Sequence, residues 1–187
     1  MKRLTILVAA ALGALVALPA SAAFDGAYDV SNWTTTVNGV PAAGGSTINT
    51  SGAPASITFL GGDLGCSSGP CTIDFTIAVV GSGSMAFDWD YETFDEEGPG
   101  FEDWGYLLNG AFTLLSVGGG AIQSGSQLIA TSEGDIFGFR LDCTDCILGP
   151  ANVTVSNFHG AVPAPATLGL LGVGLMGLAA LRRRQAA

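Results

Sequence analysis

Carboxylates gather in one stretch of the chain, where eight acidic residues fall within positions 88–103 and no lysine, arginine or histidine separates them. Oxygen ligands collected in this way are those that Ca²⁺ prefers, since that ion takes about six to eight oxygens in a flexible geometry. The candidate calcium ligands are Asp88, Asp90, Asp95 and Asp103.

The same acids also have a simpler interpretation. An EF-hand loop beginning at Asp88 would need glycine at the position of Thr93 and a bidentate glutamate at that of Pro99, so the segment is not an EF-hand. A solvated acidic loop would keep a secreted domain soluble without any bound ion. We therefore expect no certain cofactor, with Ca²⁺ as the candidate if one binds.

Aromatic rings are interleaved with these acids. Phe101 and Trp104 are flanked by acidic residues and glycines, so they are the rings that we expect at the surface. An exposed ring offers a rigid apolar platform on which a sugar can stack. The stretch is therefore compatible with carbohydrate binding, while the other rings are expected to fill the core.

Four cysteines occur as two close pairs, Cys66 with Cys71 and Cys143 with Cys146. In a secreted domain of this size, four cysteines most simply form two disulfides. We expect local pairing, although crossed connectivities are also compatible with the sequence. A four-cysteine zinc site is the competing interpretation, which an oxidising compartment disfavours.

No catalytic arrangement stands out in the sequence. His159 is the only histidine, and no Gly-x-Ser-x-Gly nucleophile elbow is present. Two carboxylates could serve a glycosidase, but the separation that such a pair requires is not encoded in a sequence this rich in acids. We expect a protein that is not an enzyme.

The charges are divided unevenly along the chain. All sixteen carboxylates lie in the segment 24–161, and Arg140 is its only lysine or arginine, so its formal charge is −15 against −10 for the whole chain. Such a surface repels nucleic acid and anionic lipid. We therefore expect no nucleic-acid partner.

The sequence predicts that these residues lie on β-strands and on the loops between them. Segments rich in Val, Ile, Thr and aromatic residues are separated by glycine clusters, and no window sustains a helical period. In 85–92 a strict alternation places Asp88, Asp90 and Glu92 on one face and large apolar residues on the other. The predicted strands are 33–37, 56–60, 72–80, 84–91, 105–108, 111–117, 127–131, 136–142 and 152–158.

Short strands at this spacing predict an all-β fold of the β-sandwich class, with a jelly roll as the favoured version. Two Asn-Gly pairs, at 38–39 and 109–110, predict two-residue hairpin turns between neighbouring strands.

The start of the chain has the pattern of a targeting segment. Lys2 and Arg3 precede an apolar run over 4–18, and small residues follow at 20–23. A charged region, an apolar region and a small-residue cleavage site together predict a secretory signal peptide over residues 1–23. The exported domain is then expected to span 24–160.

A second apolar segment lies near the other end. Residues 164–181 carry no charge, and as a helix they would cover about 27 Å, close to the hydrocarbon thickness of a bilayer. Arg182, Arg183 and Arg184 follow, and such a cluster stays on the cytoplasmic side. The sequence therefore predicts a single C-terminal transmembrane helix.

Val162, Pro163, Ala164 and Pro165, followed by the glycine-containing apolar span and the terminal arginine cluster, resemble the PEP-CTERM sorting signal. Ala164 stands where the family usually has glutamate. The resemblance implies recognition by exosortase, a membrane-embedded cysteine protease thought to cut such proteins from their anchor. A plain membrane tail that is never cut is the alternative.

These features divide the chain into a signal peptide (1–23), a secreted domain (24–160) and a sorting tail (161–187). We expect a non-enzymatic protein of the cell surface or the exopolysaccharide and biofilm matrix, exported through the inner membrane of a Gram-negative bacterium as a membrane-anchored precursor. The expected partners are the membrane, an exosortase-type protease and extracellular polysaccharide. The alternative function is a carbohydrate-binding module, with a possible dependence on calcium.

Overall fold

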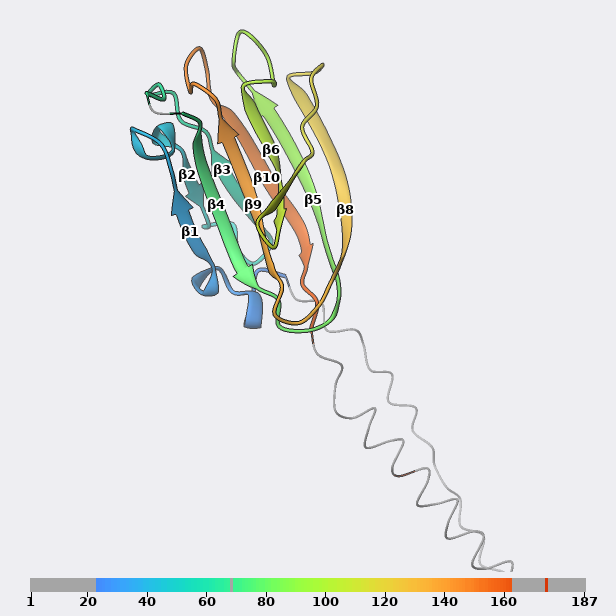
Figure 1. The fold of residues 1–187 in the computed structure, drawn as a ribbon. Coiled ribbons are helices and arrows are strands. Elements are labelled where there is room, and N and C mark those ends of the chain that lie inside the picture. Colours follow the sequence, from blue (N-terminus) through green and yellow to red (C-terminus); the bar gives the residue numbers. More distant parts are fainter. Residues whose placement is uncertain (1–22, 68, 163–173, 175–187) are drawn as a thin grey trace, which may run out of the picture.

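The computed structural model describes residues 23–67 and 69–162, together with Gly174. Within them the chain forms ten strands and three short 3₁₀ helices (Figure 1). The strands are β1 (Thr34–Val37), β2 (Thr47–Asn49), β3 (Ser56–Leu60), β4 (Cys71–Ala78), β5 (Gly83–Thr93), β6 (Glu102–Leu108), β7 (Ala111–Leu114), β8 (Ile122–Thr131), β9 (Ile136–Cys143) and β10 (Ala151–His159). The 3₁₀ helices are η1 (Gly26–Tyr28), η2 (Val30–Asn32) and η3 (Ala42–Gly45).

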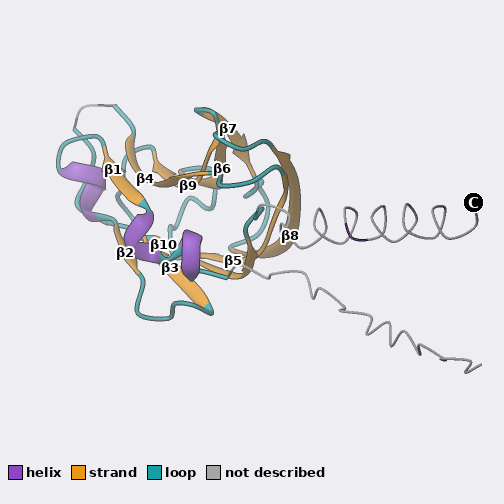
Figure 2. Cartoon of the chain, turned by 90° about the horizontal axis from the view of Figure 1, so that it is seen from below, coloured by secondary structure: helices purple, strands orange, loops and turns teal. Residues whose placement is uncertain are grey.

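Two antiparallel five-stranded sheets pack face to face as a β-sandwich, which confirms the predicted class. The strand order is β1-β4-β9-β6-β7 in one sheet and β2-β3-β10-β5-β8 in the other, and Figure 2 shows the two layers from one end. Most consecutive strands lie in opposite sheets, including β5 and β6. The short loop 94–101 therefore carries the chain from one layer to the other.

Each of the nine predicted strands corresponds to an observed strand. The strand β2 was missed because it has only three residues and pairs at the edge of a sheet. The strand β8 begins at Ile122, five residues earlier than predicted, because its whole length pairs with β5 despite a run of Ser and Gly of low strand propensity. Pairing with β5 thus makes β8 longer than its local composition predicts.

The two predicted hairpin turns had different outcomes. Asn109 and Gly110 join β6 to β7 with φ of 52° and 82°, the left-handed conformations that a two-residue hairpin needs. The hairpin predicted at Asn38 and Gly39 is wrong, because β1 and β2 on either side belong to different sheets. Gly39 instead lies directly against Cys71, where a side chain would collide with the cysteine sulfur.

Aromatic rings fill the space between the sheets. Phe139 of β9 is fully buried and contacts six rings from both layers, with centroid separations of 4.9 to 6.4 Å: Trp33, Phe59, Phe87, Trp104, Phe137 and Phe158. Several of these contacts are edge-on, the geometry that aromatic pairs favour. Phe139 is therefore the centre of the core.

The predicted signal peptide and transmembrane tail fall largely on residues 1–22 and 163–187, outside the described residues except for Gly174. Across the part of the chain that the structure describes, no helix has both the length and the apolar character needed to cross a membrane.

Truncation of the central ring should cost more stability than truncation of an exposed one. Phe139→Ala is expected to lower the free energy of unfolding by about 3 to 5 kcal/mol, because it leaves a cavity among six rings. Phe94→Ala removes the same atoms from a side chain that is 54% exposed, and should change stability by about 0.5 kcal/mol or less. Urea unfolding of both variants measures the difference, and equal losses would contradict this role for Phe139.

Candidate functional site

The outer face of the β10-β5-β8 sheet carries the row of carboxylates predicted from the sequence. Along β5 the residues Met85, Phe87, Trp89 and Tyr91 are buried, while the alternate positions face outward. Asp88, Asp90 and Glu92 therefore project from one surface, at every second residue of the strand.

Asp88 is held in place by the strands on either side. The hydroxyl of Ser126 on β8 donates to its Oδ1 at 2.5 Å, and Nδ2 of Asn157 on β10 donates to its Oδ2 at 2.7 Å. These two hydrogen bonds, that from Ser126 first, lower the pKa of the Asp88 carboxyl. Asp88 is therefore an ionised acceptor with a fixed orientation.

A β-bulge in β10 brings Asn157 to this face. The pairing of β10 with β5 shifts between Ser156 and His159, and Asn157 has a φ of 48°. The extra residue lets both Ser156 and Asn157 lie on the outer side, while Phe158 still enters the core. Bulges commonly re-aim side chains in this way, and the sequence carried no signal for this one.

Two adjoining hollows run along this face. One, of about 340 Å³, is lined by Asp88, Asp90, Ser124, Ser126, Ser156 and Asn157, among others. The other, of about 250 Å³, is lined by Asp90, Glu92, Ser124, Gln123, Asn152 and Thr154, among others. Because Asp90 and Ser124 border both, the hollows form one shallow channel beside β5, which we call the β5 groove.

The four predicted calcium ligands are not brought together. Asp88 and Asp90 lie on the outer face of one sheet, whereas Asp103 of β6 lies on the outer face of the other. Asp95 is buried just after β5, where its Oδ1 accepts from the backbone of Glu97 and Gly98. In the described residues no group of three acidic, histidine or cysteine side chains is arranged to hold a metal ion.

The least expected carboxylate is Glu102, at the start of β6. Its side chain is on the inner face and only 1% exposed, Thr93 donates a hydroxyl to its Oε2 at 3.0 Å, and its Oε1 has no hydrogen-bond partner in the described residues. Burial, reinforced by the nearby charges of Asp95 and Asp145, raises the pKa of Glu102 to about 8. Glu102 is therefore a neutral acid at ordinary pH.

The single arginine of the domain lies on the opposite outer face from the β5 groove. Arg140 of β9 makes a two-point ion pair with Asp74 of β4, with both nitrogen–oxygen distances at 2.7 Å. Asp142 and Asp103, paired across β9 and β6, complete this face, and burial raises the pKa of both carboxyls. Within the residues that the structure describes, the β5 groove thus faces solvent without a lysine or arginine near it.

The two rings predicted to stack on sugars have different positions. Trp104 is fully buried, stacks on Phe139 at 5.8 Å and meets Phe59 edge-on, so the prediction of an exposed ring there is wrong. Its position on β6 turns it inward although acids flank it in the sequence. Phe101 is partly exposed in the loop before β6, and the most exposed ring of that loop, Phe94, was not singled out.

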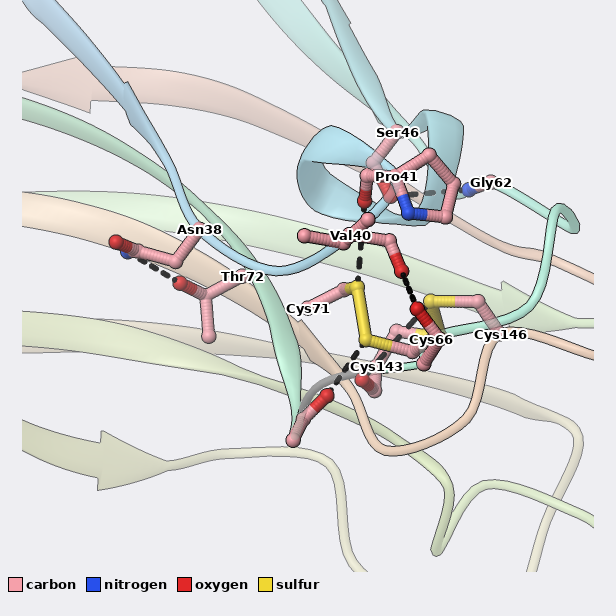
Figure 3. The surroundings of a disulfide bond; sticks show 12 residues. Asn38, Val40, Pro41, Ser46, Gly62, Cys66, Cys71, Thr72, Cys143 and Cys146 are labelled. Atoms are coloured by element: carbon pink, nitrogen blue, oxygen red, sulfur yellow. Dashed lines mark hydrogen bonds between the residues drawn. A yellow bond between two sulfur atoms is a disulfide. The ribbon is translucent and has the colours of Figure 1, made fainter.

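Both disulfides have the local pairing that we predicted, Cys66 with Cys71 and Cys143 with Cys146. Cys71 of β4 and Cys143 of β9 are direct partners in the sheet, so the two bridges lie side by side at one end of the sandwich (Figure 3). A hollow of about 460 Å³ next to them has a largely apolar lining that includes Pro41, Leu64, Cys66 and Ile147.

The sorting residues lie mostly outside the described part of the chain. Val162 is described, and its side chain is partly buried against the core. The other predicted members, Pro163, Ala164, Pro165, Arg182, Arg183 and Arg184, fall outside the described residues.

One family model matches the chain, the PEP-CTERM protein-sorting motif, over residues 161–184. The resemblance seen in the sequence is therefore confirmed, and the chain carries this motif in its C-terminal region. The motif indicates export and sorting to the cell envelope. No curated protein matches the chain.

Several solved structures are similar to the chain at low identity. A family 35 carbohydrate binding module from Clostridium thermocellum is 12% identical with a TM-score of 0.35, over 65% of this chain and 90% of that one. The CBM35 of Paenibacillus barcinonensis is 14% identical with a TM-score of 0.33, over 68% and 94%. The enzymatically active domain of tailspike protein 4 from bacteriophage CBA120 is 10% identical with a TM-score of 0.37, over 71% and 20%. Similarities at TM-scores this low carry no argument about function.

The raised pKa of Glu102 predicts that the stability of the domain depends on pH. Because the pKa of Glu102 is about 8 in the folded domain and its ordinary value is 4.5, folding favours the protonated form. The contribution of Glu102 to stability is therefore complete below about pH 4.5 and is lost progressively as the pH rises towards about 8.

Glu102→Gln should remove this dependence and raise the melting temperature, relative to the unaltered domain, most strongly above pH 8. The exposed-acid variant Glu133→Gln should keep the original pH profile. Melting curves from pH 4 to 9 test this, and parallel profiles for the unaltered domain and Glu102→Gln would show that Glu102 ionises normally.

Proposed function

We propose that this chain, which carries the PEP-CTERM protein-sorting motif, is a non-enzymatic protein of the bacterial cell surface or extracellular matrix. The observation that carries the proposal is the motif match over residues 161–184, at the end of a folded domain. An exosortase-type protease recognises the motif, and the domain is the part that reaches the outside of the cell.

The domain has properties that suit such a destination. Two disulfides close one end of the sandwich, and such bonds persist in oxidising compartments outside the cytoplasm. The strongly acidic surface keeps the domain soluble and unattached to anionic polymers. Signal peptide cleavage near residue 23 and a membrane-anchored precursor complete the proposed route.

We also infer that the sandwich is a jelly roll. The strands β3-β10-β5-β8 form four neighbours in one sheet and β4-β9-β6-β7 form four in the other. Apart from the β6-β7 hairpin, each connection between successive strands from β3 to β10 crosses from one sheet to the other, as in two interlocked Greek keys. The edge strands β1 and β2 add one strand to each sheet.

The β5 groove supports a second function from another class, the binding of a glycan. The groove is lined by hydroxyl, amide and carboxylate groups from three strands, and the orientation of Asp88 is already fixed by Ser126 and Asn157. From Asp88 to Glu92 it follows the strand for about 13 Å, which suits an extended ligand. Acceptors gathered in this way favour a ligand rich in O–H or N–H donors, and the fixed orientation of Asp88 lowers the entropic cost of binding it.

The charge of the groove limits which glycan fits. Three carboxylates face it and no lysine or arginine of the described part of the chain does, so a polymer of uronic acids would be repelled. An amine-bearing glycan would gain charge-assisted hydrogen bonds to Asp90 and Glu92, and a neutral glycan would gain ordinary ones. We propose an amine-bearing glycan as the preferred ligand, whether or not calcium takes part.

The sorting proposal predicts that the arginine cluster is required for delivery. Replacement of Arg182, Arg183 and Arg184 by Gln should leave the full-length precursor unprocessed, because the charges that stop the tail at the membrane are lost. The matched triple Lys variant keeps the charge and should be processed. Fractionation and immunoblotting of cells that express exosortase measure this, and unchanged delivery and yield of the Gln variant would reject the proposal.

The glycan proposal predicts saturable binding that depends on the groove. Asp90→Asn should weaken the binding of glucosamine oligomers by about tenfold, as expected for the loss of a charged hydrogen-bond partner. The control Asp25→Asn changes an exposed acid outside the groove and should bind normally. Calorimetry with amine-bearing, neutral and polyuronate oligomers, each with Ca²⁺ and with chelator, separates the alternatives. No saturable binding to any of them would exclude the function.

A further inference from the structure

The first residues of the sorting motif belong to the folded domain. The family match begins at residue 161, yet Ala161 is only 5% exposed and belongs to the core cluster, with Val162 packed beside it. The sequence places both residues in the tail, because nothing in their composition separates them from it. The first residue of the matched motif is thus part of the folded domain.

Tyr28 of η1 holds this segment. Its hydroxyl donates to the carbonyl oxygen of Ala161 at 2.6 Å and accepts from the backbone N–H of Val80 at 3.3 Å. The N–H of Ala161 in turn points at Sδ of Met85, at 3.2 Å. Both backbone groups of Ala161 are therefore engaged, and Tyr28, Met85 and Ala161 are all buried.

The residues before Ala161 fit closely around the same tyrosine. A Cβ on Gly160 would lie within 2.6 Å of three carbons of the Tyr28 ring, so only glycine allows the chain to pass there. Phe158 meets Tyr28 edge-on at 5.6 Å and stacks on Phe24 at 4.7 Å. The segment 158–161 is thus packed against residues from the beginning of the domain.

We propose that Tyr28, Gly160 and Ala161 form a latch that keeps the start of the sorting motif attached to the domain, so that the motif becomes accessible to its protease only when the latch opens. The inference rests on the proposed sorting function. A protease must take its substrate as a free segment of chain, and a backbone that is buried and hydrogen-bonded is reached only through local unfolding. The rate of processing of a folded chain then follows the frequency of latch opening.

A matched pair of variants tests the latch. Tyr28→Phe removes the hydroxyl that bonds Ala161, and Tyr91→Phe removes a comparable buried hydroxyl that donates to the carbonyl of Glu102 at 3.0 Å. Tyr91 is six residues along β5 from Met85, about 20 Å away towards the other end of the strand. Both variants lose one tyrosine-to-carbonyl hydrogen bond, but only the first lies at the latch.

Two readouts are needed. Hydrogen exchange of residues 158–162 should be about threefold to tenfold faster in Tyr28→Phe, the factor expected for one buried hydrogen bond, and unchanged in Tyr91→Phe. In cells that express exosortase, conversion of the precursor to the shorter form should accelerate in the same variant. Gly160→Ala, which forces a methyl group against the Tyr28 ring, should change both readouts in the same direction.

The outcomes separate the latch from the sorting function. Equal exchange in the two tyrosine variants would show that no latch exists. Faster exchange with unchanged conversion would show that the latch does not control access, and this also overturns the inference. Failure of the unaltered precursor to be converted at all would count against the sorting function, while the exchange measurement would still decide whether Tyr28 holds Ala161.

Discussion

The packing of aromatic rings between the two sheets determines which residues of the inner strands are buried and which face solvent. Phe139 contacts rings from both layers, and the inner strands β4, β5 and β10 turn their large apolar residues toward that centre. Because side chains alternate along a strand, the same packing sends the intervening residues outward. The carboxylates of β5 thus face outward because the residues that alternate with them, Met85, Phe87, Trp89 and Tyr91, face the core.

The outer faces and the ends of the sandwich then acquire different chemistry. On one face the carboxylates form a groove with hydroxyl and amide groups, and a bulge adds Asn157 to it. On the other, Arg140 neutralises Asp74. Glu102 differs from these carboxylates, because it lies on the inner face at the end of the core, where burial raises its pKa. The buried acids Asp74, Asp95 and Glu102 each have a hydrogen-bond partner.

The first and last residues of the folded domain also pack against each other in the core. Phe24 and Tyr28 come from its first residues, and Phe158 and Ala161 come from its last, yet all four pack together. The disulfides lie at the opposite end of β4 from Val80, which contacts Tyr28. The end of the sandwich that carries the disulfides is thus far from the end where Tyr28 holds Ala161, and only the end with Tyr28 is continuous with the sorting motif.

Features that depend only on neighbouring residues are predictable from local patterns: the alternation in β5, the turn at Asn109 and Gly110, the pairing of nearby cysteines and the sorting motif. The sheet that each strand joins is not predictable in this way, because it depends on pairing between distant segments. That pairing places Asp103 and Asp88 on different sheets, and packing buries Trp104 despite its acidic neighbours and Ala161 despite its place at the start of the predicted tail. A period of two residues shows that a strand has two faces, but only the packed partner determines which face is buried.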